Sequence, residues 1–186
     1  MTYINVNEQY PGIRSLLDFR PEIAKPLGAL ANVLLREGTP GLQAADRELI
    51  GAHVSYLNDC FYCRHSHAAI ACEYLDGQQE MVESVVTGKQ HPDITPKMAA
   101  LLTIAASVQR NGKEVTQHQV DQARNQGATD LEIHDTVLIA ALFCLFNRYV
   151  DGLSANTPQD LSTYPTRAKE VVAHGYRGPQ RETNSP

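Results

Sequence analysis

Helix-start signals recur along the sequence, and no other feature constrains the fold of this chain as strongly. They are the dipeptides Thr39-Pro40 and Thr95-Pro96, and Thr129 followed three residues later by Glu132. A threonine side chain can accept a hydrogen bond from an unpaired helical N–H, and proline fits the first helical position because its missing N–H is not needed there. Thr129 and Glu132 together have the pattern of a capping box. The chain is therefore expected to consist of helices that begin at these points.

Apolar residues follow helical spacing between these signals. Within residues 22–36, Ile23, Leu27, Leu30 and Leu34 recur at steps of three and four, which indicates one apolar helix face. No segment alternates between apolar and polar residues over the length of a strand. We therefore predict an all-α fold. The expected helices span residues 22–36, 40–57, 60–75, 79–86, 97–110, 116–125, 130–150 and 165–173.

The composition is that of a globular protein. The chain has 186 residues, of which 42% are hydrophobic, and this is enough for one core. We expect a single domain over residues 1–186, with a core at about 15–153 and a C-terminal extension at 154–186. The formal net charge of −5 argues against nucleic acid and against an anionic membrane as partners.

A cytoplasmic location is expected from two further features. The longest unbroken apolar run, residues 137–146, has ten residues, whereas a bilayer requires roughly 20. The first five residues lack the basic and apolar blocks of a signal peptide. We therefore expect no membrane-spanning helix.

The four cysteines are too few to frame a chain of this length with disulfides. They are Cys60, Cys63, Cys72 and Cys144. In a reducing compartment a close pair such as Cys60 and Cys63 is more often redox-active or metal-binding than structural. Cys72 and Cys144 stand among apolar residues and are expected to be small buried side chains.

Cys60, Cys63 and His67 are expected to share one helix face. Each α-helical residue turns the direction by about 100°, which places the three side chains within about 60° of one another. A free cysteine is only about 3% thiolate at pH 7, and a helix N-terminus favours the thiolate. His67 follows Cys63 by one turn and is placed to take its proton.

Glu48 can reach His67 only if the chain turns back between them. In one continuous helix the two residues would lie about 28 Å apart. If the chain breaks at Asn58-Asp59, Glu48 lies about 15 Å of helical rise before the break and His67 about 12 Å after it. The two residues would then lie nearly level on antiparallel helices, where the carboxylate could orient the imidazole. We predict this break.

The resulting pattern Glu-x11-Cys-x2-Cys-x3-His resembles the alkylhydroperoxidase AhpD-like branch of the carboxymuconolactone decarboxylase superfamily. The segments 53–55 and 146–153 are similar to the peroxidase-related enzymes of that branch, and the resemblance covers about residues 15–175. It implies an all-α fold assembled as dimers, trimers or hexamers, and thiol-dependent reduction of hydroperoxides. The apolar surface of the helix expected at residues 130–150 also favours a homo-oligomer. No cofactor and no metal are expected.

The resemblance also implies roles for the four residues. Cys63 would attack the peroxide oxygen and become a sulfenic acid, and Cys60 would resolve it to a Cys60–Cys63 disulfide. His67 and Glu48 would form the proton relay. An unidentified thiol or a lipoylated protein would then reduce the disulfide, the latter being the reductant of the best-known members. Those members have histidine directly before the second cysteine, where this chain has Tyr62, and a phenol titrating near 10 is a poorer proton carrier at neutral pH.

Other interpretations of the cysteine pair stay open. It could belong to a disulfide oxidoreductase without peroxide turnover, or to a non-enzymatic redox sensor or scaffold. With His67 or His65 the pair could form part of a zinc site, although Cys72 and Cys144 stand alone and offer no second ligand pair. Haem attachment requires histidine directly after the second cysteine, and Arg64 is there instead. Decarboxylase or lactone chemistry is disfavoured because it does not require paired thiols.

Overall fold

The computed structural model describes residues 2–36 and 40–177, and all regular structure within these residues is helical, which confirms the predicted fold class. The first five helices are α1 (Ile13–Phe19), α2 (Pro21–Leu35), α3 (Ala44–Leu57), α4 (Phe61–Tyr74) and α5 (Gln79–Val86). They are followed by α6 (Pro96–Arg110), the 3₁₀ helix η1 (Gly112–Glu114), α7 (Gln117–Asn125), α8 (Asp130–Gly152), the 3₁₀ helix η2 (Leu161–Thr163) and α9 (Tyr164–His174).

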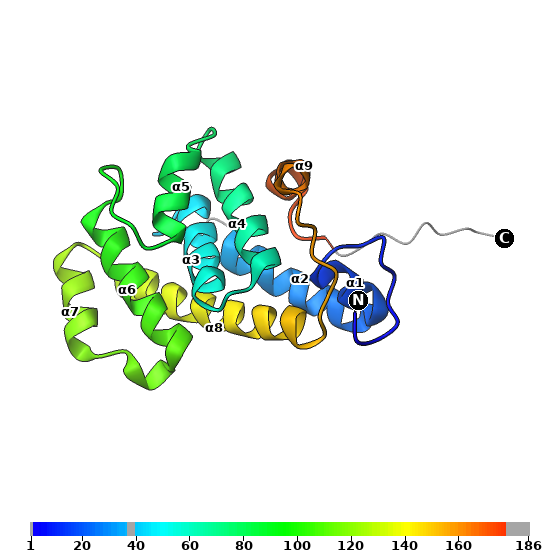
Figure 1. Ribbon diagram of the computed structural model, residues 1–186. Coiled ribbons are helices and arrows are strands. Elements are labelled where there is room, and N and C mark those ends of the chain that lie inside the picture. Colours follow the sequence, from blue (N-terminus) through cyan, green and yellow to red (C-terminus); the bar gives the residue numbers. More distant parts are fainter. Residues whose placement is uncertain (1, 37–39, 178–186) are drawn as a thin grey trace.

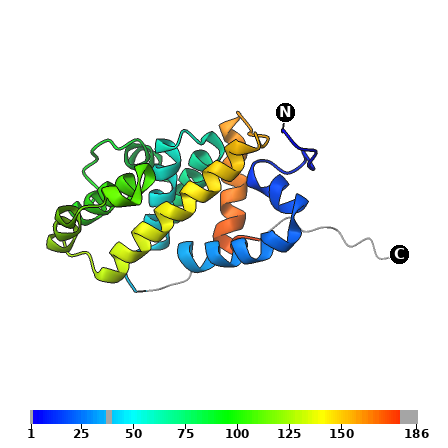
Figure 2. The same cartoon turned by 90° about the horizontal axis from the view of Figure 1, so that it is seen from below.

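The long helix α8 runs along the whole bundle, with α6 and α7 towards one end and α1 and α9 towards the other (Figures 1 and 2). Helix α3 contacts α2, α4, α5, α6 and α8. It is therefore the central helix of the fold.

The central position of α3 forces its polar side chains to find partners inside the protein. Every residue from Arg47 to Ser55 is buried. Arg47 Nη1 lies 3.0 Å from Asp135 Oδ2 on α8, and Asn147 Nδ2 on α8 donates to Ser55 Oγ at 3.0 Å. Because an unbonded polar group is costly to bury, these contacts fix how α3 lies against α8.

The chain reverses between α3 and α4 at Asn58-Asp59, as predicted. Asp59 has φ 57°, in the left-handed region that aspartate tolerates better than most residues. Asn58 Nδ2 donates to Asn147 Oδ1 at 2.8 Å, and the Cys60 N–H donates to the Ser55 carbonyl at 2.9 Å. The turn is thereby fixed to α8 as well as to the end of α3.

Two of the predicted capping signals are confirmed. Thr95 Oγ1 accepts a hydrogen bond from the Met98 N–H at 3.1 Å, and Thr129 Oγ1 accepts one from the Glu132 N–H at 3.2 Å. Thr116 also caps α7 in a capping box. The sequence does not predict α1, because the seven residues of this short helix lie between proline-containing segments and contain little periodic pattern.

The predicted start of α3 at Pro40 is wrong. The helix begins at Ala44, where Gln43 and Asp46 form a capping box. The Thr39-Pro40 signal, four residues earlier, is the one from which the start was predicted. Thr39 itself lies outside the described residues.

Helix α8 is long and apolar enough to cross a membrane by length and composition alone, and among the described helices it alone has this property. Half of its most apolar stretch is buried within the protein, where α8 packs against α3 and α6. The unbroken apolar run at residues 137–146 is shorter than the apolar part of α8, because Thr136 and Asn147 end the run while the helix continues. Leu138 and Leu145 of α8 remain exposed. Homo-oligomerisation through such residues stays a prediction.

Candidate active site

The two neighbouring cysteines lie at the start of α4. Cys60 occupies the N-cap position and Cys63 the first turn, and they are 0% and 3% exposed. The Cys60 side chain is hydrogen-bonded to the Cys63 side chain and also to the exposed Asp151 at the end of α8. The hydrogen bond to Cys63, together with burial, raises the pKa of the Cys60 thiol far above its usual range. Cys60 therefore remains protonated at neutral pH, and its single S–H can donate either to Cys63 or to Asp151.

Glu48 and His67 lie together, as the predicted chain reversal requires. Glu48 Oε2 is 2.6 Å from His67 Nδ1. Glu48 is fully buried on α3, and His67 is nearly so on α4. A carboxylate only accepts hydrogen bonds, so Nδ1 carries the proton when Glu48 is ionised. This tautomer leaves the lone pair on His67 Nε2.

Tyr176 completes this group and is a residue that the sequence analysis missed. Its hydroxyl donates to Glu48 Oε1 at 2.5 Å and lies 3.3 Å from His67 Nδ1. The two rings stack with centroids 5.9 Å apart. Burial and the neighbouring Glu48 carboxylate raise the pKa of Tyr176 well above its ordinary value, so the phenol remains a donor. No motif signals this residue, because 109 positions separate it from His67.

Helix α2 holds the segment that carries Tyr176. Asn32 Oδ1 accepts from the Tyr176 N–H at 2.8 Å, and Asn32 Nδ2 donates to the Tyr176 carbonyl at 3.1 Å. Arg36 Nη2 donates to the Val172 carbonyl at 2.8 Å. Gly175 has φ 82°, and a Cβ there would lie 2.6 Å from Asn32 Oδ1. A glycine at this position therefore allows the chain to turn Tyr176 towards Glu48.

Phe143 also packs against the imidazole of His67. Its ring meets His67 edge-on, with centroids 4.5 Å apart and an interplanar angle of 86°. A Cβ at Gly51 of α3 would come within 2.2 Å of the Phe143 ring. The absence of a side chain at Gly51 thus lets α8 place Phe143 against His67, where packing limits rotation of the imidazole.

Cys63 and His67 line one cavity of about 100 Å³. Tyr176 also lines it, together with three arginines (Arg14, Arg167 and Arg177). Most of the remaining wall is apolar and comes from Ile13, Leu17, Ala24, Leu27, Gly28, Ala31, Leu35, Ile70, Phe146 and Val171. A small apolar cavity with a few converging polar groups is typical of a small-molecule site.

Tyr62 is not part of the Glu48–His67–Tyr176 group. Its ring is buried beside Tyr164, with centroids 6.1 Å apart, and its side chain is hydrogen-bonded to Ser66. Burial raises the pKa of Tyr62 to about 12. Tyr62 is therefore protonated at neutral pH, which is consistent with the expectation that it carries protons poorly.

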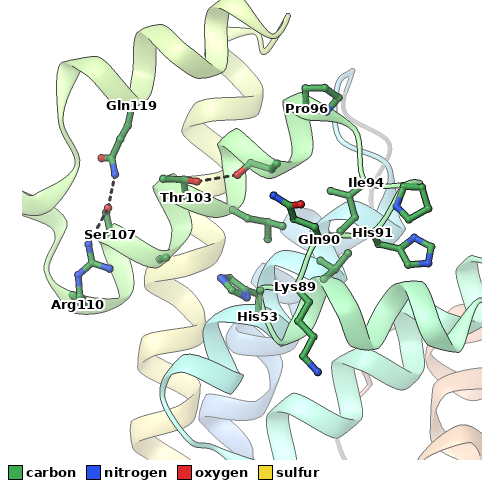
Figure 3. Close-up of a pocket in the computed structure, with 16 residues that line it drawn as sticks. His53, Lys89, Gln90, His91, Ile94, Pro96, Thr103, Ser107, Arg110 and Gln119 are labelled. Carbon is green, nitrogen blue, oxygen red and sulfur yellow. Dashed lines mark hydrogen bonds between the residues drawn. The ribbon is translucent and has the colours of Figure 1, made fainter.

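A second and larger cavity, of about 790 Å³, is lined by two other histidines, His53 and His91. Figure 3 shows His53 on one side of it and Ser107 and Arg110 of α6 on another. His53 Nδ1 is 3.0 Å from the Val86 carbonyl, and burial lowers the pKa of this histidine. Among the described residues that line this cavity there is no cysteine, aspartate or glutamate.

The remaining cysteines and the alternative zinc ligand lie apart from the site. Cys72 and Cys144 are half-buried rather than fully buried as expected, and Cys144 Sγ lies 3.9 Å from the Gln109 carbonyl. His65 Nδ1 lies 2.8 Å from the Phe61 carbonyl of its own helix. Within residues 2–36 and 40–177, no three His, Cys, Asp or Glu side chains are grouped so that they could hold a metal ion.

Comparison with known proteins adds a family and several structural relatives. The model of the carboxymuconolactone decarboxylase family matches residues 21–87 and 72–156. An uncharacterized peroxidase-related protein from Silicibacter sp. TM1040 superimposes with a TM-score of 0.75 at 21% identity, over 86% of this chain and 93% of the other. No protein with a curated description matches this chain.

Two further crystal structures have similar folds. One is an uncharacterized peroxidase-related protein from Ralstonia eutropha JMP134, named as an alkylhydroperoxidase AhpD core, with a TM-score of 0.72 at 26% identity over 81% of this chain and 78% of the other. The second is a protein of unknown function from Agrobacterium tumefaciens, linked by name to the antioxidant defence protein AhpD. It has a TM-score of 0.68 at 21% identity over 86% of this chain and 100% of the other.

Proposed function

The chain belongs to the carboxymuconolactone decarboxylase family as an AhpD-like member, and on this premise we propose that it is a thiol-dependent peroxidase that reduces alkyl hydroperoxides. The observation that carries the proposal is the cavity that Cys63 and His67 share, with Glu48 bonded to Nδ1 of the imidazole. The name of the Ralstonia protein, which is 26% identical, supports the same chemistry.

The first step is loss of the Cys63 proton. Nε2 of His67, one helical turn away, accepts this proton as the general base. The Glu48 carboxylate at Nδ1 stabilises the imidazolium that forms, and the Tyr176 hydroxyl holds Glu48 in place. The N-terminal end of α4 and the hydrogen bond from Cys60 both stabilise the negative charge on the Cys63 sulfur.

The second step is oxidation of Cys63. Its thiolate attacks the terminal oxygen of the hydroperoxide, so an S–O bond forms while the O–O bond breaks. The alkoxide that leaves takes the proton from His67 and departs as an alcohol. Cys63 is oxidised by two electrons to a sulfenic acid, and the peroxide is reduced by the same two electrons.

The third step closes a disulfide. The Cys60 sulfur attacks the Cys63 sulfenic sulfur, an S–S bond forms, and hydroxide leaves with the Cys60 proton as water. The side-chain hydrogen bond between the two cysteines supports this pairing. An external dithiol, such as a lipoyl group, then restores both thiols and is itself oxidised to a disulfide.

The burial of both thiols favours this function over disulfide exchange with other proteins. At 0% and 3% exposure, Cys60 and Cys63 are out of reach of a disulfide on a folded protein surface, whereas a small hydroperoxide fits the cavity. A slender dithiol arm meets the same requirement, which makes a lipoyl group a suitable reductant.

Counting free thiols after one equivalent of hydroperoxide tests the proposal. Wild type should lose two of its four thiols and form a Cys60–Cys63 disulfide. Cys63→Ser should lose none on the same time scale, and Cys60→Ser should stop at a sulfenic acid that dimedone traps at Cys63. Cys72→Ser is the control and should behave as wild type. If wild type reacts no faster than free cysteine, the proposed function is wrong.

A further inference from the structure

The cavity that contains Cys63 differs in charge from the rest of the chain. The whole sequence has 21 acidic and 16 basic residues, with a net charge of −5. The described residues that line this cavity include Arg14, Arg167 and Arg177 but no aspartate or glutamate. Positive charge is therefore concentrated around the thiol of an acidic protein, and such a site attracts anions.

Among the described residues Arg14 has no ion pair within hydrogen-bond distance, although its charge also acts on Glu170. Its half-buried side chain lies over the Tyr10 ring, with Cζ 5.1 Å from the ring centroid. Its Nε is buried and has no hydrogen-bond partner among the described residues. Arg167, by contrast, pairs with Glu170 at 2.7 Å and donates to the Arg177 carbonyl at 3.2 Å. Arg14 lines the cavity, so the N–H groups at the end of its guanidinium can pair with an oxyanion bound there.

The rest of the cavity favours a short aliphatic group. Leu17, Leu27 and Ala31 form part of its wall, and its volume is about 100 Å³. A cavity of about 150 Å³ is known to hold a benzene ring, so this one accepts an alkyl segment of only a few carbons. A ligand that satisfies both features has a short apolar chain and one anionic end.

We propose that the substrate of this site is a short aliphatic hydroperoxide that also bears a carboxylate, with the carboxylate bound by Arg14 and the alkyl segment in the cavity beside Cys63. The inference rests on the proposed peroxidase function and names its substrate class. The planar guanidinium matches a carboxylate through two parallel hydrogen bonds, and it offsets the repulsion between the substrate anion and the Cys63 thiolate. The hydroperoxy acid is reduced to the hydroxy acid and water while Cys60 and Cys63 are oxidised to the disulfide.

A binding measurement tests the anion site without turnover. The reduced protein is alkylated with iodoacetamide, and the rate at Cys63 is followed by mass spectrometry with and without hexanoate or hexan-1-ol. Hexanoate should slow alkylation of wild type at roughly 10-fold lower concentration than hexan-1-ol. Arg14→Gln should remove this difference, and Arg14→Lys should restore part of it.

Arg20→Gln is the matched control, because Arg20 ends the same helix, is exposed and pairs with Glu22 rather than lining the cavity. It should keep the preference for hexanoate. Equal protection by hexanoate and hexan-1-ol in wild type, or an unchanged preference in Arg14→Gln, would overturn the inference whatever the protein does with peroxides.

Measuring kcat/KM with two hydroperoxides distinguishes failure of the carboxylate preference from failure of the proposed peroxidase function. With 5-hydroperoxypentanoate, kcat/KM should exceed that with pentyl hydroperoxide by roughly 10-fold, and Arg14→Gln should make the two equal. Equal values in wild type would contradict the carboxylate preference while leaving a peroxidase. If neither compound oxidises Cys63 faster than it oxidises free cysteine, the proposed peroxidase function is wrong. Protection by hexanoate then decides by itself whether the site binds a carboxylate.

Discussion

His53 and His67 line two different cavities of this protein, and only His67 is equipped for proton transfer. His67 has a carboxylate at 2.6 Å, a phenol at 3.3 Å and a cysteine one turn earlier on its helix. His53 is hydrogen-bonded to the backbone of Val86, at 3.0 Å, and of Val85, and burial lowers its pKa. The cavity that His53 lines is the larger of the two, at about 790 Å³, so the proposed active site is not in the larger cavity.

The difference between the two histidines shows how a buried carboxylate stabilises a charged imidazolium. Burial alone disfavours the charged imidazolium, because the ion loses its hydration. An acidic partner inside the protein replaces that hydration, and the Glu48 carboxylate does so for His67. Helix α3 carries both Glu48 and His53, but Glu48 contacts His67 of α4, whereas His53 is bonded to the backbone of α5. The partner on the neighbouring helix therefore decides which histidine can act as a base.

Replacing His67 and His53 in turn by asparagine tests most directly whether only His67 acts in proton transfer. The asparagine amide keeps the bond that Nδ1 makes but removes Nε2, so His67→Asn retains a partner for Glu48 and loses the base. The rate of Cys63 oxidation should fall by about 10²–10⁴-fold in His67→Asn. His53→Asn, the matched control, should stay within about 2-fold of wild type. Stopped-flow measurement with a hydroperoxide gives both rates, and equal losses would contradict the distinction between the histidines.

Removing the charge of Glu48 should have the next largest effect. Glu48→Gln keeps the shape of the side chain but no longer stabilises the imidazolium, and the rate should fall by about 10–100-fold. Glu132→Gln is the control, because Glu132 is also buried and pairs with Lys97 at 2.6 Å. It should lower thermal stability without changing the rate. A rate loss in Glu132→Gln as large as that in Glu48→Gln would indicate a general structural effect.

Removing the Tyr176 hydroxyl should have a smaller effect on the rate. The hydroxyl donates to the Glu48 carboxylate, so its loss leaves Glu48 less firmly held against His67. In Tyr176→Phe, kcat/KM at pH 7 should be about 3–10-fold lower than in wild type. Tyr149→Phe, which removes a long 3.5 Å bond to the Leu16 carbonyl, should leave kcat/KM unchanged. An unchanged kcat/KM in Tyr176→Phe would exclude a role in the relay.

The smallest expected effect concerns stability at His53. Because burial lowers the pKa of His53 in the folded chain, the unfolded chain binds a proton more readily, and the free energy of unfolding falls as the pH drops below about 6.5. This residue contributes at most about 1.4 kcal/mol per pH unit to the slope. His53→Asn should therefore give a flatter dependence between pH 7 and 5 in urea unfolding, whereas the exposed His118→Asn should not. Parallel curves for wild type and His53→Asn would contradict this origin.

Local sequence signals predicted the helices and the chain reversal that brings Glu48 to His67. Helical spacing and the caps at Thr95 and Thr129 depend on residues close in sequence, and so does the break at Asn58-Asp59. Glu48 and His67 could be expected to lie level on two antiparallel helices because the rise per helical residue is fixed.

The third partner of the relay and the anion site could not be found in this way. Tyr176 and Arg14 reach the cavity because α9 and α1 pack across α4 and α8, and no local pattern encodes that packing. The start of α3 was placed too early because two capping signals compete within a few residues, and burial of Leu42 helps to decide between them. Homo-oligomerisation through exposed residues such as Leu138 and Leu145 stays a prediction, because no local pattern encodes the surface that would cover them.

The most direct test of the account is the second-order rate constant for oxidation of the reduced protein by 5-hydroperoxypentanoate, compared with free cysteine at the same pH. If Cys63 is activated by the Glu48–His67 pair, wild type should react at least about 100-fold faster than free cysteine. The product should contain one Cys60–Cys63 disulfide per chain. A rate constant equal to that of free cysteine would show that the buried pair does not activate the thiol.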